Sequence, residues 1–599
     1  MALPSCCPSD ANCTSNPISI SWCGAQSSFS APEEEPPSLR STLEKHMRHP
    51  TGFTHTPGQE NARIEHQAHK PWLHWPATLE DVRQSEAHRH LHAYLTSYKT
   101  IAARTRQVRD AVFKAYEKGQ MSRQTVKDTE RNVAAFFQGG SAADWAFYSA
   151  DCDKAVFRQE QFFRYLFGVN EADVFGLLDF SRRQAVLFVP WTSPEYQRFM
   201  GPPRAAEWYM KRYGLDGAVV YKEGLQEIRE ELKKRHISHL LVLRGQNSDS
   251  DRLVEPPAVA RDLGISSIDD SQFLYDLLAE CRVHKTELER DYLRAACLVS
   301  SQGHTFVMRN IYPGMVEGQG EALFRAFVHY AGGARHVAYD CICCAGPHGA
   351  ILHYGHAGRP NDGVIKCGDM LLFDMGGEYG GYSTDITLSY PVNGVCSREQ
   401  RVVYEAAYEA QRAVEMAMKP GVMWTDMHRL AEKKILERLL AAGVLNGPLE
   451  ACIAAHLGSV FMPHGLGHLL GVDTHDVGGF SPEYPRSSEP GLCYLRTTRK
   501  LEENMVITVE PGCYFVPFLI DKALSNPTQS RLINAASLKQ YMHLGGVRLE
   551  DVVLVTSDGI ENLTVVPRRL EDVEELLATR TRNGLSVETV EQKKRKAVL

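Results

Sequence analysis

The stretch MLLFDMGGEYGGYSTDITLSY, residues 370–390, gives the strongest indication of how this chain folds. An apolar run ends in Asp374, glycine-rich residues follow, and strand character resumes at Asp385. The pattern predicts two strands, 370–374 and 385–390, that flank a glycine-rich hairpin and bring the two aspartates to opposite positions on neighbouring strands. Two carboxylates this close repel each other unless a cation or a proton lies between them.

A second group of polar residues lies in HGLGH, residues 464–468. Its two histidines are four residues apart, which is the spacing of the helical zinc motif. The intervening glycines disfavour a helix, so a loop or a strand edge is expected and only one of the two histidines, His468, need be a ligand. His475 follows seven residues later.

Two glutamates lie at the ends of further apolar segments. The run 505–510 is a predicted strand that ends in Glu510 before a Pro-Gly turn. Glu550 lies two residues after Arg548, which places both side chains on one face of a predicted strand over 547–555. A buried glutamate is costly without a partner. A structural Arg548–Glu550 salt bridge is the alternative interpretation of this pair.

The potential ligands Asp374, Asp385, His468, Glu510 and Glu550 form a set of four carboxylates and one imidazole. Such a set can hold two divalent cations that share carboxylates. Two cations about 3.5–4 Å apart convert a bridging water into a hydroxide nucleophile at neutral pH. The sequence therefore favours a hydrolase that acts through a metal-bridged hydroxide.

Composition narrows the class of protein. A chain of 599 residues predicts two large domains plus extensions, and 43% hydrophobic with 23% charged residues is typical of a globular protein. A net charge of −7 gives no general basic field for nucleic acid or an anionic membrane, and no apolar run is long enough for a transmembrane helix. The 15 scattered cysteines favour reduced thiols and a cytoplasmic location.

The chain divides into four segments. Residues 1–90, rich in Ser, Pro and His, are predicted to be a disordered extension; few acids near the start allow a transit peptide, but the absence of Arg there argues against one. Residues 91–282 are predicted to form an α/β domain, with strands over 174–178, 185–189, 218–221 and 240–243 and a charged helix over 225–235. The segment 283–577 is the predicted catalytic domain, and 578–599 is a tail.

Helix signals locate the start of the catalytic domain. Thr286 and Glu289 form a predicted capping box, and Ser397 with Gln400 forms a second one that opens a helix ending at Ala417. Thr425 is expected to cap a third helix, which ends before residue 443. Strands near residue 341 and over 370–374, 385–390, 505–510 and 547–555 lie between and after these helices. Helices packed on an antiparallel sheet make this an α+β arrangement.

The motifs resemble those of a known family. LLFDMGGEY (371–379), STDI (383–386), HGLGHLLGVDTHDVGG (464–479), VEPG (509–512) and GGVRLED (545–551) are similar to those of the prolidases, the Xaa-Pro dipeptidases of the pita-bread metallopeptidase superfamily. LHYGHAGRPND (352–362), CRVHKTELE (281–289) and LRTTR (495–499) resemble the eukaryotic branch. The similarity covers residues 95 to 575 and implies an α+β fold, with a C-terminal pita-bread (creatinase/aminopeptidase-like) catalytic domain after a smaller α/β domain.

The resemblance also implies a metal centre. It assigns two Mn²⁺ ions to the five ligands, with Asp385 and Glu550 bridging both ions, His468 and Glu510 serving one, and Asp374 the other. Carboxylate-rich sites suit Mn²⁺, although one imidazole leaves Zn²⁺, Co²⁺ and Fe²⁺ open. The substrates implied are Xaa-Pro dipeptides that end in proline or hydroxyproline, and the implied assembly is a homodimer.

Further residues match family positions around the substrate. The resemblance assigns His353 and His475 to the scissile peptide and Arg496 to the C-terminal carboxylate of the dipeptide. Arg548 and Tyr339 match other positions that line the site. In this scheme Glu510 manages the proton of the attacking water, and His475 helps to stabilise the oxyanion. A guanidinium suits a carboxylate because it donates two parallel hydrogen bonds.

Three features depart from the family pattern. Family members present a tryptophan from the partner subunit toward the substrate, whereas the corresponding segment 196–200 offers Phe199. Pro347 and His348 replace the usual residues before the stretch AILHYGHAG. The N-terminal extension has no family counterpart.

Three alternative functions remain at the level of sequence. An aminopeptidase that removes Xaa-Pro from longer peptides uses the same metals, and comparing Ala-Pro with Ala-Pro-Ala separates the two activities. A non-catalytic pita-bread binding module is disfavoured because such relatives lack several ligands, whereas all five are present here. Metal analysis distinguishes a metal-independent hydrolase of the creatinase type.

Overall fold

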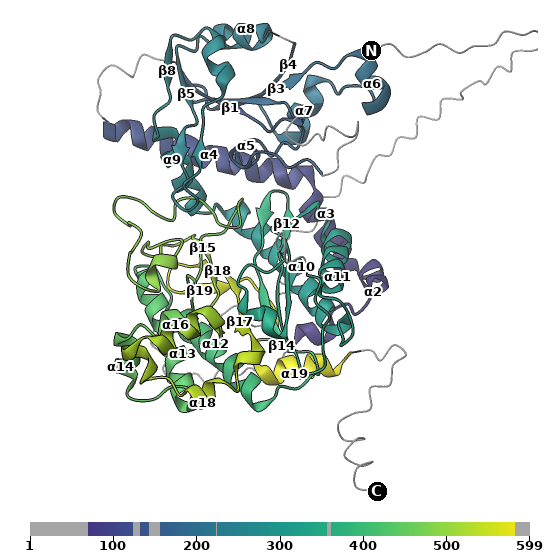
Figure 1. Cartoon of the computed structure of the whole chain (residues 1–599). Coiled ribbons are helices and arrows are strands. Elements are labelled where there is room, and N and C mark those ends of the chain that lie inside the picture. The colour runs from purple at the N-terminus through teal and green to yellow at the C-terminus, as the bar shows by residue number, and fades with distance from the viewer. Residues whose placement is uncertain (1–69, 124–131, 143–155, 223, 356–360, 581–599) are drawn as a thin grey trace, which may run out of the picture.

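A computed structural model describes residues 70–123, 132–142, 156–222, 224–355 and 361–580. Two domains lie one above the other (Figure 1), and the long helix α4 (Tyr98–Arg123) runs along the underside of the N-terminal sheet. Helix α9 (Phe273–Val283) leads from this sheet into the catalytic domain. Helices of the length and apolarity that a bilayer crossing requires do not occur in the described ranges.

The N-terminal domain contains a six-stranded mixed sheet in the order β4-β3-β2-β1-β5-β8. Its strands are β1 (Val133–Gln138), β2 (Phe175–Asp179), β3 (Gln184–Pro190), β4 (Gly217–Tyr221), β5 (His239–Val242) and β8 (Ser267–Asp269). The pairs β3–β4, β1–β5 and β5–β8 are parallel, whereas β1–β2 and β2–β3 are antiparallel. The four strands predicted in this domain are confirmed within one residue at each end.

Both faces of the inner strands β1, β2, β3 and β5 are buried, which explains the nearly continuous apolar character of these strands. Successive residues of β1 point to opposite faces, so that Phe136 and Phe137 belong to separate hydrophobic clusters. Helix α8 (Gln226–Lys234) covers one face with buried Ile228 and Leu232, and confirms the predicted charged surface helix. Helices α4 and α5 (Gln161–Phe167) cover the other face.

The extension is ordered closer to the N-terminus than the sequence predicts. The prediction of disorder up to residue 90 is wrong for residues 70–90, which form η1 (Pro71–His74), α2 (Leu79–Gln84) and the start of α3 (Glu86–Thr96). Trp72 and Val82 are buried against the main core, and the Trp72 carbonyl accepts a hydrogen bond from Arg309 at 2.5 Å. The catalytic domain therefore supplies the apolar surface that the segment itself lacks. Residues 1–69 and 581–599 lie outside the described residues.

The catalytic domain packs long helices around short antiparallel strands. The helices include α10 (Glu287–Asn310), α11 (Glu317–Gly332), α12 (Arg398–Ala417), α13 (Trp424–Ala441) and α19 (Leu570–Ala578). Ser397 and Gln400 form the predicted capping box of α12. At α10 the Thr286 N–H donates to the Glu289 carboxylate at 2.8 Å, whereas the Thr286 hydroxyl is buried without a hydrogen bond among the described residues.

The predicted cap of α13 is wrong. The helix begins at Trp424 after Met423, so Thr425 lies inside its first turn. The Trp424 side chain is fully buried, and its indole N–H donates to the Gly467 carbonyl at 3.2 Å. Burial of this aromatic residue at the first helical position decides where the helix starts. Gly443 follows the helix with a positive φ of 70°, as expected of a residue just beyond a helix end.

The strands near the predicted ligands form several small antiparallel sheets. They include β10-β11-β14, made of β10 (Ile342–Ala345), β11 (Met370–Asp374) and β14 (Thr387–Pro391), and β15-β18-β19, made of β15 (Val506–Val509), β18 (Asp551–Val555) and β19 (Ile560–Asn562). A third, β13-β12-β9, contains β9 (His336–Val337), β12 (Gly377–Tyr379) and β13 (Tyr382–Ser383), and a fourth pairs β16 (Gly512–Tyr514) with β17 (Gly546–Arg548).

The register corrects one prediction about the two aspartates. Asp374 pairs with Thr387 across β11 and β14, so Asp385 is not opposite Asp374 but precedes β14. The glycine-rich segment between them forms its own hairpin, β12–β13, which pairs with β9 in another sheet. The chain thus leaves one sheet after Asp374 and returns to it just after Asp385.

Candidate active site

A cavity of about 870 Å³ lies between the two domains. From the catalytic domain it is lined by all ten predicted site residues, namely Tyr339, His353, Asp374, Asp385, His468, His475, Arg496, Glu510, Arg548 and Glu550. His464 lines it as well, and the N-terminal domain contributes Asn247, Asp249, Ser250 and Arg252. The structure thus brings together residues that lie more than 200 positions apart in the sequence.

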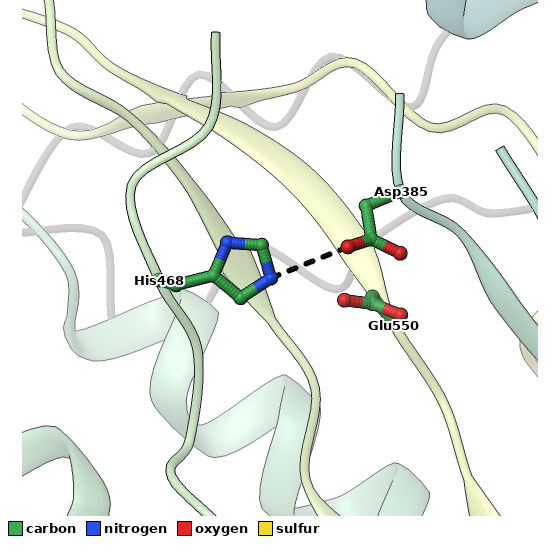
Figure 2. A group of neighbouring side chains, drawn as sticks. All are labelled: Asp385, His468 and Glu550. Atoms are coloured by element: carbon green, nitrogen blue, oxygen red, sulfur yellow. Dashed lines mark ion pairs between the residues drawn. The ribbon is translucent and has the colours of Figure 1, made fainter. Parts of the chain in front are cut away.

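Three predicted ligands form the centre of this group. Asp385, His468 and Glu550 are buried, and each offers one ligand atom within 4.8 Å of the others (Figure 2). The His468 Nε2 lies 3.2 Å from the Asp385 carboxylate, while its Nδ1 lies 3.0 Å from the Leu469 carbonyl. A bond from Nδ1–H to this carbonyl leaves Nε2 free to bind a cation.

Asp374 and Glu510 lie next to these three. The Tyr339 hydroxyl is 2.5 Å from the Asp374 carboxylate and 2.6 Å from the Asp385 carboxylate, so one phenol connects the two aspartates. On the other side, a Glu510 oxygen lies 3.5 Å from the His468 Nε2. The five predicted ligands therefore converge on one buried volume, with β11, β14, β15 and β18 holding four of them at strand ends.

Arg548 has a different partner from the one that the alternative interpretation predicts. Its guanidinium donates to the Asp374 carboxylate at 2.6 Å and to the Tyr514 hydroxyl at 2.9 Å. The Glu550 carboxylate instead accepts from the Thr387 hydroxyl at 2.6 Å. The Arg548–Glu550 salt bridge is therefore not formed, and Glu550 keeps its second oxygen for another ligand.

Burial makes it costly to ionise most of the acids at this centre, and repulsion between the acids adds to that cost. Burial raises the pKa of Asp374 to about 6 and that of Glu510 to about 7, and it raises the pKa of Glu550 well above the usual range. Burial also opposes ionisation of Asp385, but hydrogen bonds from His468 and Tyr339 outweigh it and lower its pKa. Carboxylates held in this way are stabilised by cations between them, and four carboxylates with one imidazole fit divalent metals such as Mn²⁺.

The neutral His475 lies beside the predicted ligands. The His475 ring lies with its centroid 4.4 Å from that of His468, and burial lowers its pKa so that the imidazole is uncharged at neutral pH. The segment that carries His475 is fixed by a buried ion cluster, in which Asp476 lies 2.5 Å from Arg282 and 3.2 Å from Lys285. Helix α9 and the residues after it thus position His475.

His464 lines the site although only the other histidine of HGLGH, His468, was predicted to act there. Its Nδ1 lies 2.8 Å from the Gly465 carbonyl, and its Nε2 is buried without a hydrogen-bond partner among the described residues. Burial lowers the pKa of His464 to about 3, so its Nε2 can accept a hydrogen bond from a molecule in the cavity. The two histidines of HGLGH, four residues apart, were the feature of the sequence that could have identified His464 as a site residue.

Arg496, which the resemblance assigns to a substrate carboxylate, lies at the rim nearest the N-terminal domain. Its Nη1 donates to the Asp249 carboxylate at 2.7 Å. Asp249 was not predicted as a site residue. It belongs to the other domain, and its sequence neighbours are typical of a turn. Phe199 lies elsewhere, on α6 (Pro194–Met200), where 82% of its surface is exposed.

Two family models match the chain. The model for metallopeptidase family M24 matches residues 291–557, and the model for the aminopeptidase P N-terminal domain matches residues 120–241. The first match contains the five convergent ligands, and the second contains strands β1 to β4 and most of β5 of the six-stranded sheet. The matches agree with the division into two domains around one cavity.

Curated proteins and solved structures resemble the chain over most of its length. It is 44% identical to the Xaa-Pro dipeptidase of Mus musculus, over 74% of this chain and 88% of the mouse protein, and 45% identical to that of Homo sapiens, over 71% and 85%. A "Probable Xaa-Pro aminopeptidase" of Verticillium alfalfae is 36% identical over 71% and 88%. Zinc-substituted E. coli aminopeptidase P in complex with product superposes with a TM-score of 0.62 at 25% identity, over 80% of this chain and 99% of that one.

Proposed function

This chain belongs to metallopeptidase family M24, and we propose that it hydrolyses Xaa-Pro dipeptides that end in proline or hydroxyproline. It is an enzyme with a pita-bread catalytic domain and an aminopeptidase P N-terminal domain. The observation that carries the proposal is the convergence of the five candidate metal ligands in one interdomain cavity. The similarity to mammalian Xaa-Pro dipeptidases supports the choice of substrate.

The proposed cofactor is a pair of Mn²⁺ ions, held by Asp374, Asp385, His468, Glu510 and Glu550. Divalent cations at such a centre supply Lewis acidity toward the peptide carbonyl and make a bound water acidic near neutral pH. The oxygen-rich donor set favours Mn²⁺ over metals that prefer nitrogen or sulfur ligands. Asp385 and Glu550 are the proposed shared ligands, as the resemblance to the prolidases implies; both lie in the central group, and a carboxylate has two oxygens with which to bind two cations.

Glu510 is the proposed general base and acid. It lies partly buried at the cavity wall beside His468, and the Thr508 hydroxyl lies 3.2 Å from its carboxylate. In the proposed reaction Glu510 takes the proton of the attacking water and returns it to the prolyl nitrogen as the peptide bond breaks. This transfer is needed because the prolyl nitrogen must gain a proton to leave as an amine when the bond to the carbonyl carbon breaks.

The histidines hold the scissile peptide. His475 is neutral and lies against His468, so its N–H can donate to the carbonyl oxygen as negative charge develops there. His353 lines the same cavity and is proposed to help orient the scissile peptide. Arg496 is proposed to bind the C-terminal carboxylate of the dipeptide one residue beyond the cleaved bond, which sets the length of the substrate.

We further propose a homodimer in the cytoplasm. A group of exposed apolar side chains on and near α6 offers a surface for a second copy, namely Trp191, Tyr196, Phe199 and Met200. Isolated exposed apolar residues are ordinary, but a cluster of them marks an interaction site. Light scattering of the purified protein tests the dimer, with twice the chain mass expected. The scattered cysteines support the reducing compartment, which cell fractionation tests.

An Xaa-Pro aminopeptidase is the second candidate function. Its support is the 36% identity to the fungal relative and the structural match to E. coli aminopeptidase P. The dipeptidase is favoured because identity is higher, 44–45%, over a similar share of the chain.

The test of the proposal is a substrate panel after metal exchange. The protein is stripped with a chelator, reconstituted with Mn²⁺, and assayed on Gly-Pro, Ala-Pro, Ala-Ala and Ala-Pro-Ala. Hydrolysis of the two Xaa-Pro dipeptides, with little activity on Ala-Ala or Ala-Pro-Ala, is expected. Preferred hydrolysis of Ala-Pro-Ala would instead identify an aminopeptidase, and no hydrolysis of any Xaa-Pro peptide would contradict both assignments.

A further inference from the structure

A hairpin of the N-terminal domain forms part of the cavity rim beside Arg496. Strands β6 (Gly245–Gln246) and β7 (Leu253–Val254) pair antiparallel, and the loop between them is closed by mutual backbone hydrogen bonds. The Asn247 side chain accepts from the N–H groups of Asp249 and Ser250, at 2.9 and 3.1 Å. These bonds form an Asx-type turn that directs the Asp249 side chain.

The base of this hairpin is fixed on the interdomain helix. At Gly245 an added Cβ would lie 2.2 Å from the Tyr275 ring, so the backbone contacts this residue of α9 directly. Tyr275 and Val254 both line the cavity. The loop therefore has a defined position relative to the catalytic domain.

Asp249 contacts two arginines of the catalytic domain. One carboxylate oxygen lies 2.7 Å from the Arg496 Nη1, and the other lies 3.4 Å from the Arg486 Nη2. The Arg486 guanidinium also lies 4.3 Å from the centre of the Phe480 ring. The Asp249 side chain is only 13% exposed, so solvent screens this pairing less than it screens a surface salt bridge.

The cluster of Asp249, Arg486 and Arg496 carries a net charge of +1. Two guanidinium groups face one carboxylate, and in the described part of the chain no hydrogen bond engages the Nε or Nη2 of Arg496. These two nitrogens form an edge that can hold a second carboxylate in the bidentate manner. A dipeptide whose carboxylate binds there completes a balanced set of two positive and two negative groups.

We propose that Asp249 is a specificity-determining residue that excludes peptides longer than two residues. The inference rests on the proposed function and deepens it. The C-terminal carboxylate of a tripeptide would lie about 3.5 Å further along the chain than that of a dipeptide, which brings it toward the Asp249 carboxylate. Like charges at that range oppose binding, and Arg496 cannot neutralise both at once. Arg496 thus favours substrates with a C-terminal carboxylate, and Asp249 disfavours those whose carboxylate lies one residue further from the cleaved bond.

The experiment compares wild-type protein with Asp249→Asn in the Mn²⁺-loaded form. Asparagine keeps the shape of the side chain and removes the charge. For each variant, kcat/KM is measured on Ala-Pro, Ala-Pro-Ala and Ala-Pro-Ala-NH₂, which lacks the terminal charge. We expect the ratio of Ala-Pro-Ala to Ala-Pro to rise by at least about tenfold in Asp249→Asn. The ratio of Ala-Pro-Ala-NH₂ to Ala-Pro should rise much less.

A matched control is Asp251→Asn in the same loop. Asp251 is exposed and has a positive φ of 57°, a conformation that asparagine tolerates, so the loop should keep its shape. This variant should keep the wild-type ratios. An unchanged ratio in Asp249→Asn, or an equal rise for the acid and the amide, would overturn the inference.

A measurement on wild-type protein alone guards against a variant that fails to fold. Wild-type protein should cleave Ala-Pro-Ala-NH₂ faster than Ala-Pro-Ala, and the difference should shrink as salt is added, because salt screens the repulsion. Equal rates at low salt would overturn the inference. Failure of wild-type protein to cleave Ala-Pro overturns the proposed function, whereas activity on Ala-Pro with no acid–amide difference overturns this inference only.

Discussion

The guanidinium of Arg548 lies 2.6 Å from the carboxylate of Asp374, and both side chains are buried. Arg548 also donates to the Thr387 hydroxyl at 3.2 Å, and Thr387 in turn donates to Glu550. One arginine therefore holds a proposed ligand directly and a second one through a threonine. It also supplies a buried positive charge beside these acids.

Replacement of Arg548 should destabilise the fold and weaken metal binding. Arg548→Gln leaves the buried Asp374 carboxylate without its ion-pair partner, which typically costs about 3–5 kcal/mol in free energy of unfolding. Chemical denaturation and metal titration of the stripped protein measure the two effects. Arg401→Gln, which removes partly exposed ion pairs with Glu571 and Glu574, is the control and should change stability by less than about 1 kcal/mol. A similar small effect for Arg548→Gln would contradict this role.

Replacement of Arg496 should affect binding of a carboxylate and little else. Arg496→Ala is expected to raise KM for Gly-Pro by about tenfold to a hundredfold, because a charged hydrogen bond is lost, while the metal content stays the same. The KM for Gly-Pro-NH₂, which has no terminal charge, should change far less. Steady-state kinetics on both substrates gives the comparison, and equal losses on the two would remove the assigned role.

His475 should affect the rate rather than metal binding. His475→Asn removes the imidazole that faces the developing negative charge, and loss of one such donor lowers kcat by about a hundredfold or more. Metal content by mass spectrometry should match that of the wild type. The exposed His456, whose positive φ of 52° asparagine also accepts, provides the control His456→Asn with unchanged kcat. Loss of metal from His475→Asn would show that the residue acts on the metal centre instead.

Removal of metal should make the stability of the protein depend on pH. In the metal-free protein the pKa of Asp374 is about 6 and that of Glu510 is about 7, above their ordinary values near 4. The folded state therefore binds these protons more tightly than the unfolded state. The resulting stabilisation is fully present below about pH 4 and is lost as the pH rises through about 6 to 7. Calorimetry of stripped protein should thus show a melting temperature that falls between about pH 5 and pH 8.

Added Mn²⁺ provides the comparison for that series. Cations take the place of the protons, so the loaded protein should melt at a higher temperature, with the largest gain at the alkaline end. A stripped protein whose melting temperature rises between about pH 5 and pH 8 would contradict the assignment of these carboxylates to a repelling cluster.

Strand and ligand positions could be predicted where the signal is local. Asp374, Glu510 and Glu550 each lie at or beside the end of a buried apolar strand, and such runs are visible in the sequence. The capping box at Ser397 has the same local character. The error at Thr425 arose because burial of Trp424, a tertiary effect, decides where that helix starts.

Contacts between domains could not be read from the sequence in the same way. The segment around Asp249 contains only polar turn residues, and nothing in it indicates that Arg496, about 250 positions later, lies 2.7 Å away. The helical structure of residues 70–90 also depends on contacts that are distant in the sequence. Trp72 is buried by the catalytic domain rather than by its own neighbours. The relative position of Asp374 and Asp385 depended on an inserted hairpin that joins another sheet.

The most direct test of the metal centre is an anomalous difference map from crystals of the protein soaked in Mn²⁺. Two strong peaks are expected about 3.5–4 Å apart, both within bonding distance of Asp385 and Glu550. One peak should also contact His468 and Glu510, and the other Asp374. A map without peaks among these five residues, or with manganese bound elsewhere on the chain, would contradict the central claim.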